Sequence, residues 1–284
     1  MYDLKITGGT IVDGTGKPGY RGDVGIATGR IVALGQADVN AHQTIDAAGR
    51  VVCPGFIDIH THYDFQLFWD PMLSISSWHG VTTVVIGNCG FGIAPTRPEH
   101  RDLMTATMEN VEGMDVRALR EGMGEEWPFE TFPELLEAIE QRGVAVNVGV
   151  LIGHSPVRLY VMGTDSVERA ATADEVGRME AIVSEGLDAG AIGFATSKTG
   201  MHVGFQGRPV PSRLAELDEI RALAGVLGRA DRGIMMAAIG RGLFFKEFAM
   251  IAEETGRPIC WAALLAGMKG PGSHRSMLER TKAQ

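Results

Sequence analysis

The sequence predicts an α/β protein, in which a small N-terminal β-sandwich over residues 1–53 precedes an incomplete (β/α)8-type barrel over residues 54–284. Two observations support this prediction. Short strand-like runs separated by glycine-containing turns fill the first part of the chain. After Pro54, nearly uniformly apolar runs alternate with amphipathic helical ones, which is the pattern of a parallel sheet covered by helices.

The N-terminal unit is expected to consist of short strands. Turn signals such as Gly8-Gly9 and Asp13-Gly14 separate them. The expected strands are Leu4–Ile6, Thr10–Val12, Val24–Ile26, Arg30–Leu34 and Asp46–Val52. Hydrophobic residues make up 45% of the 284 residues and charged residues 21%, so an ordinary globular core is expected.

The barrel part is expected to contain six strand–helix units. The expected strands are Phe56–His62, Val81–Ile86, Val144–Ile152, Ala191–Thr196, Ile234–Ile239 and Ile259–Leu265. A closed barrel has eight strands, so we expect an open barrel with two apolar edges. Self-association through these edges is the expected consequence, and the alternative is that residues 104–123 fold over the opening.

Amphipathic periodicity predicts helices between the strands. Thr131 with Glu134, and Thr172 with Glu175, have the spacing of a capping box at a helix start. The expected helices are Thr131–Arg142, the helix that follows Thr172, Leu214–Leu227, Leu243–Glu254 and Ser276–Lys282. The segment Phe91–Phe129 shows no clear period and is expected to be a long loop.

The first barrel strand carries an unusual set of polar residues. Side chains alternate along a strand, so Asp58, His60 and His62 are expected on one face of Phe56–His62. Two imidazoles at one end of a strand can hold one metal ion together. The competing interpretation is a pair of satisfied core histidines. Because more acidic residues follow in an otherwise apolar setting, the pattern favours metal binding.

Charge and composition exclude several classes of partner. The net charge of −9 argues against a nucleic-acid backbone as partner. Three cysteines without paired spacing argue against a disulfide framework and for a reducing compartment. The N-terminus lacks the basic start and apolar core of a signal peptide, and no apolar run is long enough to span a membrane. We therefore expect a soluble, cytoplasmic protein without a membrane partner.

Several motifs together resemble a known family. Residues 54–64, Pro-Gly-Phe-Ile-Asp-Ile-His-Thr-His-Tyr-Asp, follow a small β unit and resemble the amidohydrolase superfamily. Residues 60–66 with Trp-Asp-Pro at 69–71 resemble its D-aminoacylase branch, the N-acyl-D-amino-acid deacylases. Gly-Asn-Cys-Gly at 87–90 and Gly-His-Ser at 153–155 with Arg158 fit the same branch.

The resemblance implies a metal-dependent hydrolase of a C–N amide bond with a metal-binding barrel. His60 and His62 match the paired metal ligands, and Cys89 matches the cysteine that binds zinc in D-aminoacylases. The expected cofactor is therefore a divalent metal, zinc. The family's histidines on the fifth and sixth strands have no counterpart here, and its catalytic Asp on the eighth strand is expected beyond Gln284. The resemblance thus leaves the catalytic residue unknown and makes the chain a truncated member with weak or absent activity by itself.

Four further residues are candidates for a supporting role. Asp64 could orient a ligand imidazole, or be a surface acid. His154 could be a supporting donor or a substitute ligand, or it could stabilise a loop. Lys198 stands where other amidohydrolases use a carboxylated lysine, but a solvated or substrate-facing lysine is the favoured interpretation. His202 follows in a glycine-rich loop that could contact substrate.

The first functional hypothesis is hydrolysis of a small N-acyl-D-amino acid to the D-amino acid and a carboxylate. A cyclic-amide hydrolase of the dihydropyrimidinase or dihydroorotase kind is the second, and Gly-Asn-Cys-Gly argues against it. The third is an incomplete, non-catalytic barrel that serves as a binding or assembly module. Metal content separates the third hypothesis from the other two.

Overall fold

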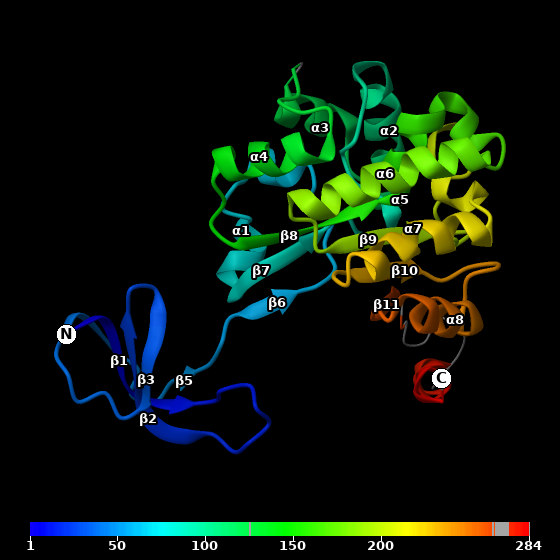
Figure 1. The fold of residues 1–284 in the computed structure, drawn as a ribbon. Coiled ribbons are helices and arrows are strands. Elements are labelled where there is room, and N and C mark those ends of the chain that lie inside the picture. The colour runs from blue at the N-terminus through cyan, green and yellow to red at the C-terminus, as the bar shows by residue number, and fades with distance from the viewer. Residues whose placement is uncertain (125, 263, 265–272, 284) are drawn as a thin grey trace. The chain divides into compact units, whose positions relative to one another are not determined.

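The computed structural model describes residues 1–124, 126–262, 264 and 273–283. The chain forms two compact units, Met1–Phe56 and Ile57–Gln284. The first is a small β unit and the second an α/β unit (Figure 1), so the fold class expected from the sequence is confirmed. Positions 263 and 265 of the expected sixth barrel strand lie outside the described residues.

The N-terminal unit is one five-stranded sheet in the order β3-β2-β1-β4, with β5 also paired to β1. Its strands are β1 (Tyr2–Ile11), β2 (Tyr20–Ala27), β3 (Arg30–Gly35), β4 (Ala41–Asp46) and β5 (Val51–Val52). The first two expected strands are a single strand, β1, whose pairing with β2 shifts register between Ile6 and Gly9. Gly9 fits there because a Cβ would lie 2.5 Å from Val52 Cγ2.

The expected strand over residues 46–52 is wrong. Asp46 ends β4, and its Oδ1 accepts a hydrogen bond of 2.9 Å from the backbone N–H of Ala48. Such an Asx turn takes a backbone N–H out of a strand ladder, so the chain turns before β5 begins.

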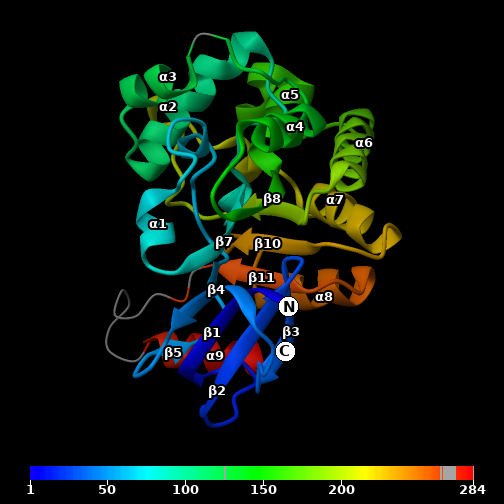
Figure 2. The same ribbon diagram turned by 90° about the vertical axis from the view of Figure 1, so that its left-hand side faces the viewer.

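The second unit is built on one six-stranded sheet in the order β11-β10-β9-β8-β7-β6 (Figures 1 and 2). Its strands are β6 (Phe56–Asp58), β7 (Val81–Ile86), β8 (Asn147–Gly153), β9 (Gly193–Ser197), β10 (Ile234–Ala238) and β11 (Ile259–Ala262). From β7 to β11 every neighbouring pair is parallel. The open barrel expected from the sequence is therefore present, with β6 and β11 at its two edges.

Four helices pack side by side along this sheet in chain order (Figure 1). They are α4 (Phe132–Arg142), α6 (Ala173–Ala189), α7 (Leu217–Arg229) and α8 (Phe245–Thr255), and α9 (Ser273–Lys282) follows near the end of the chain. Both predicted capping boxes, Thr131 with Glu134 and Thr172 with Glu175, are confirmed. The core lies between these helices and the sheet, where Met179 and Val183 of α6 and Ile152 and Phe194 of the strands are fully buried.

One prediction about the connections is wrong, and one helix was not predicted at all. The expected loop Phe91–Phe129 contains α2 (Arg101–Glu112) and α3 (Val116–Met123), and α2 buries Met104 and Met108 at helical spacing. A further helix, α5 (His154–Met162), begins directly after β8. The short helix α1 (Ser74–Trp78) precedes β7. Within the described ranges, no helix is both long and apolar enough to cross a membrane.

Candidate metal centre

The histidine pair follows β6 rather than lying on it. The prediction of a buried strand over residues 56–62 is wrong, because β6 ends at Asp58 and Ile59 is 59% exposed. Asp58 Oδ1 accepts a 3.1 Å hydrogen bond from the backbone N–H of His60, which turns the chain out of the ladder. Thr61 then holds the segment against β7, because its backbone N–H and its Oγ1 both donate to the carbonyl of Val85.

Cys89 sits in a sharp turn at the end of β7. Gly87, Cys89 and Gly90 have φ values of 79°, 57° and 74°, so three left-handed residues reverse the chain within four positions. A side chain at Gly90 has no room, because a Cβ would lie 2.8 Å from Thr196 Cα. The backbone N–H of Cys89 donates to Met236 Sδ at 3.3 Å. These constraints fix the direction of the Cys89 side chain.

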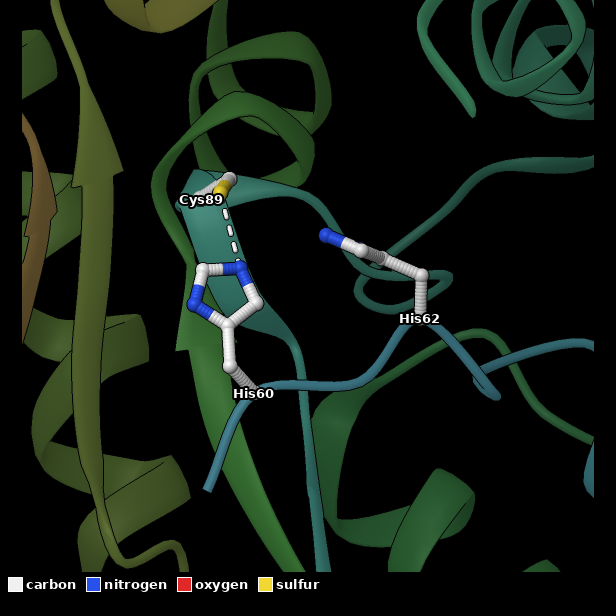
Figure 3. A group of neighbouring side chains, drawn as sticks. All are labelled: His60, His62 and Cys89. Atoms are coloured by element: carbon white, nitrogen blue, oxygen red, sulfur yellow. Dashed lines mark hydrogen bonds between the residues drawn. The ribbon is translucent and has the colours of Figure 1, made fainter. Parts of the chain in front are cut away.

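The three side chains converge (Figure 3). One potential ligand atom of each of His60, His62 and Cys89 lies within 4.8 Å of the others. Cys89 Sγ is 3.3 Å from His60 Nε2, and the two imidazole rings are 5.5 Å apart in an edge-to-face arrangement. Two nitrogens and one sulfur at this spacing are a donor set that suits zinc.

The electrostatics of the group fit a cation. Burial, helped by the neighbouring His60 and His202, lowers the pKa of His62 to about 4, so this imidazole is neutral and has a free lone pair. His62 Nδ1 is buried and has no hydrogen-bond partner among the described residues. Burial, followed by the charges of Glu112 and Asp64, raises the pKa of Cys89 to about 12. A bound divalent cation reverses this effect, because a coordinated thiol loses its proton.

Asp64 is buried beside the turn that carries Cys89 and is 1% exposed. Its Oδ1 accepts a 3.0 Å hydrogen bond from the backbone N–H of Gly87, which ties it to the turn that carries Cys89. Burial raises the pKa of Asp64 to about 7. Its Oδ2 has no partner within the described part of the chain. Asp64 is thus a buried carboxyl that fixes the cysteine turn, and the alternative of a surface acid is wrong.

Glu112 is a neighbour of the group that the sequence analysis missed. It is the last residue of α2, and its Oε1 lies 3.4 Å from His62 Nε2. Burial raises the pKa of this carboxyl. The residue was overlooked because its segment was expected to be a loop. The available signal was the spacing of Met104, Met108 and Glu112, which stand four residues apart on one helix face.

His202 is another neighbour of the group, with its Nδ1 2.7 Å from Ser197 Oγ. The ring of Phe91 lies between the histidines, 6.2 Å from His62 and 5.0 Å from His202. Phe91 also lines an apolar cavity of about 240 Å³ between α2, α5 and the segment after His202. Met104 and Leu159 contribute to its walls.

The structure does not bring His154 and Lys198 into contact with this group. His154 is fully buried, with Nδ1 2.8 Å from Thr196 Oγ1 and Nε2 2.7 Å from Glu219 Oε1. Arg158, also fully buried, pairs with the other oxygen of Glu219. Lys198 Nζ donates to the carbonyls of Arg213 and Ala215 at 2.6 and 2.7 Å. Both side chains hold α7 and its approach to the sheet.

Comparison with known proteins points to one family. A family model described as "Amidohydrolase family" matches residues 43–283. A D-aminoacylase of Alcaligenes xylosoxydans xylosoxydans is 38% identical over 200 residues, which cover 69% of this chain and 37% of that protein. A crystal structure of a D-aminoacylase superposes with a TM-score of 0.80 at 31% identity, covering 100% of this chain and 56% of that one.

A second solved structure is that of a relative with a bound metal. It is the N-acyl-D-glutamate deacylase of Bordetella bronchiseptica, complexed with zinc and a phosphonate inhibitor that mimics the tetrahedral intermediate. It superposes with a TM-score of 0.76 at 31% identity, again covering 100% of this chain and 56% of that one. The chain thus spans little more than half the length of these solved relatives.

Proposed function

The chain belongs to the amidohydrolase family, and we propose that it is a metal-dependent hydrolase of linear amides that acts on N-acyl-D-amino acids. The observation that carries the proposal is the convergence of His60, His62 and Cys89 within 4.8 Å of one another. The two histidines would hold a divalent metal, for which we propose zinc, together with the cysteine. Relatives that carry deacylase names support the substrate class.

When bound, the metal supplies Lewis-acid chemistry, because it polarises a carbonyl and lowers the pKa of a water molecule. The reaction adds the hydroxyl of water to the acyl carbon, breaks the C–N bond and gives a proton to the departing amine. The chain's own residues supply the frame for this step. Thr61 and Asp64 fix the two segments that carry the ligands, through Val85 and Gly87 respectively.

The apolar cavity behind Phe91 supports a substrate with an uncharged, hydrophobic part. Met104, Met108 and Leu159 form apolar wall, and the guanidinium of Arg208, the charged group among the lining residues, is paired with Glu168 at 2.9 Å. A negatively charged substrate side chain would therefore find no free cation among these described residues. We propose N-acyl derivatives of apolar D-amino acids as better substrates than those of aspartate or glutamate.

The test has two readouts. Elemental analysis should find a divalent metal in the purified protein and little in His60→Ala/His62→Ala. Any release of free amino acid by this chain should be faster with N-acetyl-D-leucine than with its L enantiomer, and absent with hydantoins. Equal metal content in the two proteins would refute the ligand set, and faster turnover of hydantoins would show that the substrate is a cyclic amide.

A further inference from the structure

Glu112 stands at the candidate metal centre and comes from a different part of the chain than the three convergent donors. Met104 and Met108, two turns and one turn earlier on the same face of α2, are 6% and 1% exposed. This packing fixes the helix and places the carboxylate beside His62. Gly113 follows with a φ of 69° and ends the helix, so Glu112 is held by α2 while the chain turns away after it.

Two pairs of neighbouring donors have the spacing of two ligands that share one ion. Two nitrogen or oxygen ligands at about 2.0–2.1 Å from a tetrahedral zinc lie about 3.4 Å from each other. Glu112 Oε1 and His62 Nε2 are 3.4 Å apart. On the other side of the group, Cys89 Sγ and His60 Nε2 are 3.3 Å apart, close to the separation expected for a sulfur and a nitrogen ligand.

The charge balance of the site and the contacts of Glu112 also favour metal binding by the Glu112 carboxylate. Two neutral imidazoles and one thiolate carry a single negative charge, so these three ligands by themselves balance only one of the two positive charges of a divalent ion. The carboxylate of Glu112 supplies the second negative charge. Among the described residues its only polar contact is with His62, and its side chain is 22% exposed. Nothing else in the described structure uses this carboxylate.

We propose that Glu112 is the fourth protein ligand of the metal centre, beside His60, His62 and Cys89. The proposal rests on the proposed function in so far as the centre binds a metal. It assigns a role to α2, and it makes the centre a four-donor site built from three segments of the chain: the turn after β6, the turn after β7 and the end of α2.

Glu112→Gln tests this assignment, with Glu109→Gln as matched control. Glu109 is on the same helix, is exposed, and accepts a hydrogen bond from the backbone N–H of Val116 that a glutamine oxygen can also accept. Zinc affinity is measured by competition with a chromophoric chelator, and ligand geometry by the visible absorption of the cobalt-substituted protein. We expect Glu112→Gln to weaken zinc binding at least about tenfold and to change the cobalt spectrum. Glu109→Gln should change neither.

Each outcome decides the question. Unchanged affinity in Glu112→Gln refutes the assignment. Weaker binding with an unchanged cobalt spectrum also refutes ligation, because it makes Glu112 a group that orients His62. If wild type binds neither zinc nor cobalt, the proposed function fails, which is a different result from either of these. Thermal unfolding without metal checks the fold, and Glu112→Asp, which keeps the charge on a shorter side chain, should lie between wild type and Glu112→Gln in affinity.

Discussion

Glu219→Gln removes a buried charge that joins two other buried side chains. Glu219 is 4% exposed, and its two oxygens contact His154 and Arg158, both fully buried. Removing one partner of a buried ion pair leaves the other charge uncompensated and costs about 3–5 kcal/mol. The glutamine oxygen still accepts the hydrogen bond from His154, so we expect a loss near the lower end, about 3 kcal/mol. That is a large part of the 5–15 kcal/mol by which domains are typically stable.

Urea unfolding followed by circular dichroism measures this loss, from the shift in midpoint at constant slope. The control is Glu254→Gln, since Glu254 pairs with Arg221 on the surface, where both side chains are 38% exposed. We expect the control to lose far less stability. A loss in Glu219→Gln no larger than in Glu254→Gln would refute the reasoning, because it would show that Arg158 finds other compensation.

The contacts of Glu219 with His154 and Arg158 also make the stability of the fold depend on pH, and the direction of that dependence follows from the pKa shifts. Burial raises the pKa of Glu219, but the hydrogen bonds and charges of His154 and Arg158 outweigh it and leave the pKa below its usual value. A carboxyl with a depressed pKa stabilises the fold above its unfolded pKa of about 4.3, and that stabilisation is lost as the pH falls. Burial also lowers the pKa of His154, so its protonation below about pH 6.5 opposes folding too. The difference in the free energy of unfolding between wild type and Glu219→Gln should therefore be largest at neutral pH and should shrink below about pH 4.

Two further predictions concern the cysteine turn and the open sheet. Gly90→Ala and Gly49→Ala place a side chain at the same φ of 74°, but a Cβ meets Thr196 Cα at 2.8 Å only at Gly90, while Gly49 has open space. In both variants the left-handed conformation should lower the free energy of unfolding by about 1–2 kcal/mol. Gly90→Ala should lose additional stability through the clash and should bind zinc more weakly. Equal losses of stability in urea unfolding would contradict this prediction. We also propose that the chain self-associates through the edges of its sheet, where Ile57 of β6 is 64% exposed. Sedimentation should detect dimers or larger species that Ile57→Lys reduces, and a monodisperse wild-type monomer would show that the edges are covered.

The strands and the capped helices could be predicted because their signals are local. The β-branched run at Val81–Ile86 is β7 with the same bounds, and both capping boxes begin helices where expected. α2 and α5 were missed for physical reasons. α2 fully buries only one narrow stripe and leaves most of its other residues half-buried, and α5 starts from Gly153 without a side-chain cap directly at the end of a strand. Where start signals are absent, the period alone must indicate the helix.

The sequence identifies three donor residues of the candidate site, but not the backbone conformation that carries them or the neighbours that surround them. His60, His62 and Cys89 were identified from their motifs, and the structure brings them together. The alternation pattern predicts the histidines on a strand face, because nothing in that pattern shows that Asp58 accepts a hydrogen bond from the backbone N–H of His60. Glu112 is about fifty positions away from His62 along the chain, and only the packing of α2 reveals that the two meet.

The ring of Phe91 packs against His62 and His202 and also lines the apolar cavity. A molecule in the cavity that displaces this ring must alter the space around His62 and His202. Thermodynamic linkage then requires reciprocity: whatever factor such a molecule imposes on metal affinity, the metal imposes on the affinity of that molecule. Through this one aromatic side chain, binding of a molecule in the cavity and binding of a metal at the centre would be two coupled equilibria. A substitution of Phe91 by a smaller residue would be expected to uncouple them.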